Sequence, residues 1–324
     1  MEINEILKEA LYIDTDITPP PPVITIGGKV IATPGNFITI NGLPKSRKTT
    51  FAFYVAAAAI AQREMFDISV NITADEKIIY IDTEQSAYDF SRQIKFLKYA
   101  IRSQNLPVNF SAYLFRKYEP DQILNSVYTI IKEQRPKILF IDNLTELVIN
   151  PNDIPESKKV IQFLKRVTGE FNLVIICLLH LGKGNLTTLG NLGSYADRGA
   201  QSALKVVFDK DTQTSTLEAY LMRSDSFFNP ITIAYDPEQK QYTKTSDPQP
   251  KQNSRKFVLM NLTDTDHRNR LAIIFKDSKQ ITYAELVEEI KKMYGVGTNI
   301  AKQQIIPYLV GNSFIKSDKG IYSY

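Results

Sequence analysis

Three short segments that are apolar except at their ends constrain the fold of this chain more than any other feature. They read KIIYID at residues 77–82, KILFID at residues 137–142 and LVIICLLH at residues 173–180. A strand without a polar face must be buried on both sides, which is typical of a parallel sheet covered by helices. Helical periodicity between these segments supports this architecture and is expected over residues 49–63, 87–103 and 121–133.

Further strands are expected on either side of this region. Residues 23–40 predict a strand, a Gly-Gly turn and a second strand. After residue 203 the segments LKVVFDK, STLEAYLMR and NPITIAYD are joined by short polar turns and predict an antiparallel flank. The sequence therefore predicts an α/β fold whose mostly parallel sheet is flanked by helices.

The segment GLPKSRKTT, residues 42–50, follows a predicted strand and opens a predicted helix. It matches the phosphate-binding pattern G-x-x-x-x-G-K-[ST] except at the second glycine. Such a loop points backbone N–H groups at phosphate oxygens above a helix N-terminus. We expect Lys48 to reach the β- and γ-phosphates and Thr49 to ligate Mg²⁺. The residues expected to contact the nucleotide are Gly42, Pro44, Lys45, Ser46, Arg47, Lys48, Thr49 and Thr50.

Arg47 stands where the second glycine of the pattern belongs. Glycine there permits backbone angles that other residues avoid. Because Arg47 directly precedes the helix, we expect it to have near-helical angles, with a guanidinium free to contact a phosphate. The substitution leaves the rate of hydrolysis open. The alternative to a phosphate-binding loop at residues 42–50 is a lysine-rich loop that opens an ordinary helix.

Acidic residues end or closely follow two of the apolar segments. Asp142 is the last residue of KILFID, and Glu84 lies in DTEQS directly after KIIYID. The carboxyl ends of parallel strands meet at one edge of a sheet, where the phosphate loop also lies. The alternative for each acid is a cap or a solvent-facing side chain at a strand end.

The order of these motifs resembles that of the RecA-like ATPases, and among them especially RepA-type hexameric helicases and their AAA-labelled relatives. The resemblance covers about residues 22–235. It implies ATP and Mg²⁺ as ligands, with Asp142 as the Walker B residue holding the water shell of Mg²⁺. It implies that Glu84 polarises the attacking water. It also implies a homo-oligomer, for which a hexameric ring is one form.

The same resemblance assigns roles to residues further along the chain. His180 falls where the family senses the γ-phosphate, although a histidine capping the strand is the alternative. Arg223 falls where RecA-like rings present a basic residue to the neighbouring subunit, with Arg198 and Lys205 as weaker candidates and a simple surface arginine as the alternative. The loop from Lys183 onward falls where such motors touch single-stranded nucleic acid.

A polar, proline-containing stretch divides the chain into two predicted domains. The expected boundaries are residues 1–245 for the nucleotide-binding domain with its N-terminal extension, 246–256 for a linker and 257–324 for a small C-terminal domain. From residue 251 onward, 12 Lys and Arg face 7 Asp and Glu, a balance of +5 in a chain of net charge +4. A basic excess in a small domain favours a polyanion such as DNA as its partner.

The C-terminal piece resembles a winged helix in its predicted order of helix, strand, helix, turn, helix and hairpin. In DNA-binding examples the third helix enters the major groove and the wing contacts phosphates. Pro307 conflicts with a straight third helix, so we expect that helix to kink or end early. A protein-interaction module is the alternative. The residues expected to face DNA are Asn299, Lys302, Gln303, Gln304, Lys316 and Lys319.

Composition also bears on the expected cellular location. A single cysteine, Cys177, excludes a disulfide within the chain and favours a reducing, cytoplasmic location. The N-terminal segment MEINEILKEALYIDTD is acidic and mixed, which predicts no signal peptide, and no apolar run is long enough to predict a membrane span.

Three functions remain open at this level. The first is an ATP-hydrolysing, DNA-associated oligomer acting in replication, mobilisation or recombination. The second is an ATP-sensing DNA-binding regulator or adaptor that hydrolyses ATP slowly or not at all, which Arg47 favours. The third is a small-molecule P-loop kinase, which ranks last because the chain has no arginine-rich lid insertion and carries the basic tail.

Overall fold

The computed structural model describes residues 18–182, 188–239, 241–245, 263–276, 278–318 and 320–324. The chain divides into two compact units, Met1–Ser246 and Asp247–Tyr324, which are described separately. Residues 1–17 of the N-terminal extension, the linker, Lys183 and Lys319 lie outside the described residues. Within the described ranges, no helix combines the length and the apolar character needed to cross a membrane.

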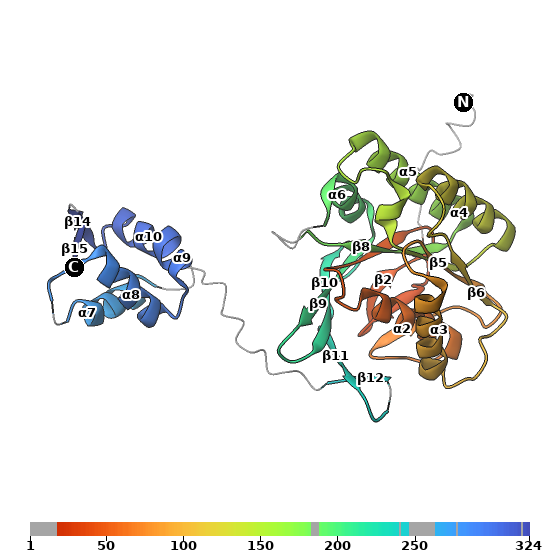
Figure 1. The fold of residues 1–324 in the computed structure, drawn as a ribbon, viewed down its shortest axis with the longest axis horizontal. Coiled ribbons are helices and arrows are strands. Elements are labelled where there is room, and N and C mark those ends of the chain that lie inside the picture. Colours follow the sequence, from red (N-terminus) through yellow and green to blue (C-terminus); the bar gives the residue numbers. More distant parts are fainter. Residues whose placement is uncertain (1–17, 183–187, 240, 246–262, 277, 319) are drawn as a thin grey trace. The chain divides into compact units, whose positions relative to one another are not determined.

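The first unit is built around a nine-stranded sheet with the order β12-β11-β10-β9-β3-β8-β7-β5-β6 (Figure 1). Six neighbouring strands are parallel, and β10, β11 and β12 continue the sheet antiparallel. The strands are β3 (Phe37–Gly42), β5 (Ile78–Asp82), β6 (Phe110–Leu114), β7 (Ile138–Asp142), β8 (Val174–His180), β9 (Ser202–Asp209), β10 (Thr214–Met222), β11 (Ile231–Asp236) and β12 (Gln241–Lys244). The predicted mostly parallel sheet is thereby confirmed.

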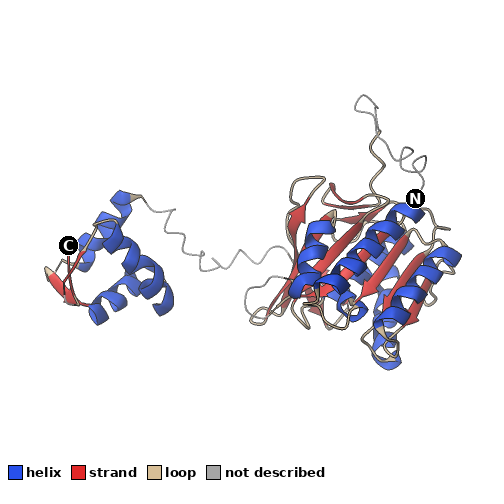
Figure 2. Ribbon diagram, turned by 90° about the horizontal axis from the view of Figure 1, so that it is seen from above, coloured by secondary structure: helices blue, strands red, loops and turns tan. Residues whose placement is uncertain are grey.

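Helices cover both faces of this sheet: Figure 1 shows them on either side of the strands, and Figure 2 looks down on the helices of one face. They are α2 (Lys48–Ala61) and α3 (Ala87–Ile101) on one face, and α4 (Pro120–Gln134), α5 (Ile154–Phe171) and α6 (Gly190–Gly199) on the other. Alternate residues of each strand feed the two cores because strand side chains alternate. Tyr80 and Phe140 pack beneath α2 and α3, whereas Ile79 and Ile141 pack beneath α4 and α5.

The apolar segments form the central strands for the reason that the sequence suggested. All five residues of β5 and all five of β7 are buried, so no face of either strand could tolerate water. LKVVFDK forms β9, which is parallel to β3 and antiparallel to β10. The antiparallel flank therefore begins with the pairing of β9 and β10.

A small second sheet covers the end of the α2 face. It has the order β2-β1-β4, with β1 (Ile24–Ile26), β2 (Lys29–Ala32) and β4 (Ile68–Val70). Gly27 and Gly28 link β1 and β2 at φ 55° and 75°, which glycine adopts without a steric penalty. The predicted hairpin is present, but it pairs with β4 rather than with the large sheet.

The second unit has its own apolar core and a three-stranded sheet of order β13-β15-β14. Its elements are α7 (Asp264–Ile274), β13 (Gln280–Thr282), α8 (Tyr283–Tyr294), α9 (Thr298–Ile300), the π-helical turn η3 (Ala301–Ile305), α10 (Ile306–Gly311), β14 (Lys316–Asp318) and β15 (Ile321–Ser323). This is the element order on which the winged-helix prediction rests, and the domain assignment itself stays a prediction.

Pro307 is accommodated in the third helix of this unit. The helix runs through α9, the π turn and α10 without ending, and Pro307 lies in the first turn of α10. A proline has no N–H for the carbonyl one turn earlier, and the wider π turn shifts the hydrogen-bond register at that point. Pro307 therefore changes the hydrogen bonding of the helix instead of terminating it.

Candidate functional site

The phosphate loop lies at the carboxyl edge of the sheet, between the end of β3 and the start of α2. β3 pairs with β8 on one side and with β9 on the other and is the fifth strand of the nine-stranded sheet, so the loop lies at the middle of that sheet. Gly42 is tightly enclosed: an added Cβ would lie 2.9 Å from the Val206 carbonyl oxygen and would also clash with Ser46. Only glycine fits at the first position of the motif.

The backbone of Arg47 contradicts the expectation of near-helical angles. Arg47 has φ 73° and ψ 29°, in the left-handed region, and Lys45 has φ 65°. The loop must reverse direction before α2 begins at Lys48, and it therefore requires the conformation that glycine normally supplies. A side chain in this region costs about 1–2 kcal/mol relative to a right-handed conformation.

The Arg47 side chain is held by aromatic rings. Its guanidinium carbon lies 4.7 Å from the Phe208 ring centroid and 5.2 Å from that of Tyr242. Its Nη1 donates a 2.8 Å hydrogen bond to the carbonyl oxygen of Gln213. The guanidinium that the sequence left free for a phosphate is therefore engaged by the antiparallel flank.

Thr49 and Asp142 meet as a metal site requires. The Thr49 hydroxyl donates a 2.8 Å hydrogen bond to Asp142 Oδ2, and the Tyr80 hydroxyl donates a 2.7 Å bond to the same oxygen. Burial raises the pKa of Asp142, while both hydroxyl donors oppose that shift. Sequence reasoning missed Tyr80, which is fully buried and stacks between Phe53 and Phe140.

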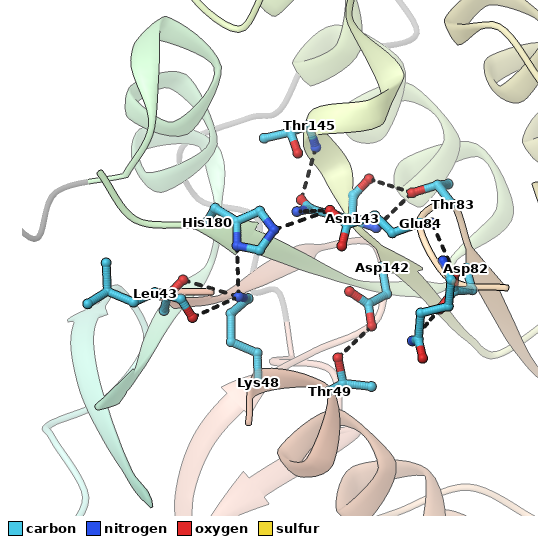
Figure 3. Close-up of polar contacts among 12 residues, drawn as sticks. Leu43, Lys48, Thr49, Asp82, Thr83, Glu84, Asp142, Asn143, Thr145 and His180 are labelled. Atoms are coloured by element: carbon cyan, nitrogen blue, oxygen red, sulfur yellow. Dashed lines mark hydrogen bonds and ion pairs between the residues drawn. The ribbon is translucent and has the colours of Figure 1, made fainter. Parts of the chain in front are cut away.

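His180 joins Lys48 to Glu84 (Figure 3). Its Nδ1 lies 3.1 Å from Lys48 Nζ, and its Nε2 lies 3.2 Å from Glu84 Oε1. A protonated lysine can only donate, so Nδ1 accepts and the Nε2 proton points to the carboxylate. Asn143 Nδ2 donates a further 2.9 Å bond to Glu84 Oε1. Sequence reasoning missed Asn143, whose signal was its place directly after Asp142.

The protonation of this group follows from its surroundings. Desolvation by burial lowers the pKa of Lys48, while Asp142 and Glu84 partly offset that effect. The hydrogen bond from His180 is the largest cause of a lowered pKa for Glu84. Lys48 Nζ also donates to the carbonyl oxygen of Gly42 at 3.1 Å. Glu84 is thus held ionised, as a group that polarises water must be.

Asp82 organises the turn that carries Glu84. It accepts hydrogen bonds of 3.0 and 2.7 Å from the backbone N–H groups of Glu84 and Gln85, and one of 2.6 Å from the Gln85 side chain. Burial raises its pKa to about 6 despite these donors. The motif DTEQS carried this signal, because an aspartate often accepts from the backbone two or three residues onward.

The converging side chains line a cleft of about 320 Å³ beside the loop. Its walls hold Lys48, Thr49, Glu84, Asp142 and His180, from the turn after β5, the ends of β7 and β8 and the start of α2. The chemistry of these residues fits Mg²⁺ and a nucleoside triphosphate: an ammonium and a helix N-terminus would bind the phosphates, and a hydroxyl and a carboxylate would hold the metal.

Arg223 lies away from this cleft within its own chain. It follows β10, its N–H donates to the Gln201 carbonyl oxygen at 3.0 Å, and the N–H of Gln201 donates to Phe37 at 2.9 Å. Phe37 begins β3 whereas the phosphate loop follows its end, so Arg223 is at the opposite edge of the sheet. Arg223 Nη2 donates to the Arg198 carbonyl oxygen at 2.8 Å.

The two weaker candidates also have local partners or neighbours. The Arg198 guanidinium donates to Ser194 and lies 4.8 Å from the ring centroid of Tyr195. Lys205 lies on β9 opposite Asn41 of β3. In the second unit, the described residues expected to face DNA are all exposed; they are Asn299, Lys302, Gln303, Gln304 and Lys316.

Comparisons with known proteins identify the family of this chain. The chain matches the family described as AAA domain over residues 6–185, more than half of its length. The solved structure of a KaiC-like protein from the hyperthermophilic archaeon Pyrococcus horikoshii OT3 is similar, with 16% identity and a TM-score of 0.46, over 65% of this chain and 90% of that chain. No curated protein matches. The match over residues 6–185 shows that the chain belongs to the AAA domain family.

Proposed function

We propose that this protein binds MgATP at the cleft beside Lys48 and hydrolyses it. The observation that carries the proposal is the chain of contacts from Lys48 through His180 to Glu84, next to the bond between Thr49 and Asp142. A phosphate-binding cation, a metal-binding pair and a water-polarising carboxylate lie together at one sheet edge. Phosphoryl transfer requires this set of positioned charges.

Each residue has a definite task in the proposed mechanism. The loop N–H groups and Lys48 bind the β- and γ-phosphates, and the Thr49 hydroxyl and Asp142 carboxylate hold Mg²⁺ with its water. Bound Mg²⁺ neutralises charge on the phosphate oxygens. Glu84 orients the attacking water and accepts its proton.

His180 connects the two halves of that mechanism. Lys48 Nζ lies 3.1 Å from His180 Nδ1, which is hydrogen-bond distance. Lys48 therefore gives up this contact when it turns to a γ-phosphate. His180 can then turn toward the phosphate while Asn143 keeps its bond to Glu84. We assign His180 the role of γ-phosphate sensor on this basis.

We further propose that the protein acts on DNA as a homo-oligomer in replication, mobilisation or recombination, in the manner of RepA-type helicases. The basic balance of the C-terminal residues and the exposed side chains of the third helix support DNA as the partner. Arg223 supports an oligomer, because its position at the far edge of the sheet suits a role toward a neighbouring subunit's phosphates. The proposed C-terminal domain is a winged helix.

The test is the ATPase rate of the full chain with single-stranded DNA, with double-stranded DNA and without DNA, alongside Lys48→Ala. We expect the rate to rise with one form of DNA and to fall at least about 100-fold in Lys48→Ala. A rate indifferent to DNA would count against the DNA-dependent motor. If Lys48→Ala still bound nucleotide as tightly as wild type, that result would count against the site itself.

The second candidate is an ATP-sensing DNA-binding adaptor with slow or no hydrolysis. The left-handed backbone of Arg47 favours it, because a strained loop can bind nucleotide in a fixed geometry without fast turnover. Size-exclusion chromatography with and without ATP separates the two candidates. Nucleotide-dependent assembly supports the motor, and a constant monomer that binds ATP supports the adaptor.

A further inference from the structure

The contacts of Arg47 carry an inference that rests on the proposed nucleotide site and extends it. Arg47 holds a left-handed conformation at φ 73° immediately before α2. An L-residue with a side chain adopts this region reluctantly, and it persists only where surrounding structure enforces it. The question is therefore what enforces it here.

Three contacts hold the guanidinium. Phe208 is the penultimate residue of β9, Tyr242 lies in β12, and Gln213 lies in the turn between β9 and β10. Ring centroids at 4.7 and 5.2 Å are within the range of cation–π attraction. The 2.8 Å bond to the Gln213 carbonyl adds a directional contact that only a donor of fixed geometry can make.

These partners are themselves well supported. The Tyr242 ring packs edge-on against Phe96 of α3 at 5.8 Å, and the Tyr242 carbonyl oxygen accepts a 3.2 Å bond from Tyr54 of α2. In the turn, Asp209 Oδ1 accepts from the N–H of Asp211 at 2.8 Å. The guanidinium therefore contacts a braced surface and not a loose loop.

We propose that Arg47 takes the place of the second loop glycine by tertiary anchoring, so that Phe208, Tyr242 and Gln213 hold the phosphate loop in its binding conformation. In the usual pattern, glycine permits the conformation at no steric penalty. In this chain, the antiparallel flank of the sheet imposes it through one side chain. Arg47 is thus a positioning residue, and nucleotide affinity depends on β9, β12 and the turn after β9.

The experiment measures the Kd of the full chain for Mg²⁺ with a non-hydrolysable ATP analogue, together with the thermal unfolding of each variant without nucleotide. Arg47→Ala removes the anchor without supplying glycine's freedom, and we expect its Kd to weaken about tenfold. Arg47→Gly removes the anchor but restores that freedom, and we expect a Kd within about twofold of wild type. This rescue is a result that a merely structural role for Arg47 would not produce.

A double-mutant cycle tests the route of the effect. Phe208→Leu should weaken binding about threefold in the wild-type background and leave Arg47→Gly unchanged. Phe171→Leu is the matched control: Arg135 is also left-handed, at φ 51°, and its guanidinium lies 4.5 Å from the Phe171 ring, away from the cleft. That variant should leave the Kd unchanged.

Several outcomes would overturn the proposal. Arg47→Ala binding as tightly as wild type would show that no anchor is needed. If Arg47→Gly bound nucleotide much more weakly than wild type, the guanidinium would have to contact the ligand itself. If Phe208→Leu weakened the Kd equally in the wild-type and Arg47→Gly backgrounds, the effect of Phe208 would not pass through Arg47. If Arg47→Ala fails to fold, the double-mutant cycle of Phe208→Leu with Arg47→Gly still tests the proposal. A wild-type chain that binds no nucleotide would overturn the proposed function and this inference with it.

Discussion

The Nε2 atom of His180 lies 3.2 Å from Glu84 Oε1, and this contact joins the end of β8 to the turn after β5. Asn143 donates to the same oxygen at 2.9 Å. Two donors therefore orient the carboxylate without either bond engaging Oε2. We interpret this arrangement as a carboxylate set in place before nucleotide arrives.

Glu84→Gln tests the assignment of the water-polarising residue. The amide preserves the size of the side chain but cannot accept a proton, so we expect ATP hydrolysis to fall about 100- to 1,000-fold. Binding of ATP should stay within a few-fold of wild type. A single-turnover rate and a Kd separate the two effects. Glu170→Gln, an exposed acid at the end of α5, is the control and should change neither.

Gly42→Ala tests the enclosure of the loop. An added Cβ would lie 2.9 Å from the Val206 carbonyl oxygen, so the loop must move and nucleotide binding should be lost. Gly169→Ala is a matched control inside α5, where an added Cβ has no neighbour within 4 Å. The control should gain about 0.5–1 kcal/mol of stability from alanine's helix propensity. Unimpaired binding by Gly42→Ala would contradict the loop geometry.

Tyr80→Phe tests the support of Asp142, the carboxylate proposed to hold the metal. The ring stacking on Phe53 and Phe140 is preserved, but the 2.7 Å bond to Asp142 is lost. We expect the Mg²⁺ concentration for half-maximal ATPase rate to rise about fivefold, from the loss of one hydrogen bond to a charged acceptor. Tyr113→Phe on β6 is the control. An unchanged Mg²⁺ dependence would remove Tyr80 from the site.

Asp82 predicts a pH dependence of stability. Its pKa in the folded protein is raised to about 6, so between about pH 4 and pH 6 the folded state binds the proton that the unfolded chain releases. The free energy of unfolding contributed by Asp82 is therefore highest at low pH and declines as pH rises through this window. As pH rises from 4 to 7.5, the free energy of unfolding of wild type should fall by about 2 kcal/mol relative to that of Asp82→Asn. Thermal unfolding of both proteins from pH 4 to 7.5 measures this, and parallel curves would disprove it.

Lys302→Ala tests the proposed DNA contact of the third helix. Lys302 is exposed beside buried Ala301, and as a phosphate contact it should strengthen binding to all sequences alike. We expect weaker DNA binding and a slope of log K against log salt that falls by about one. Lys292→Ala is the control, because Lys292 is already paired with Glu289 at 2.7 Å. Equal effects of both variants would indicate non-specific charge.

Much of the fold and of the site could be predicted from local sequence. KIIYID and KILFID are apolar between their charged ends, and a short segment without a polar side is typical of a doubly covered strand. Parallel strands bring their ends to one edge, so the sequence alone placed Lys48, Glu84, Asp142 and His180 together. Tyr80 escaped prediction because a tyrosine inside an apolar strand looks like core until its hydroxyl is found beside Asp142.

The conformation of Arg47 could not be predicted from the local sequence. The sequence alone determined that a phosphate loop lies between β3 and α2 and that its second glycine is missing. Only the tertiary structure decided how the loop keeps its shape, because Phe208 and Tyr242 are 161 and 195 positions away in the chain. Backbone preference is a property of neighbouring residues, whereas the contacts that override it are made through space by strands that the chain adds much later.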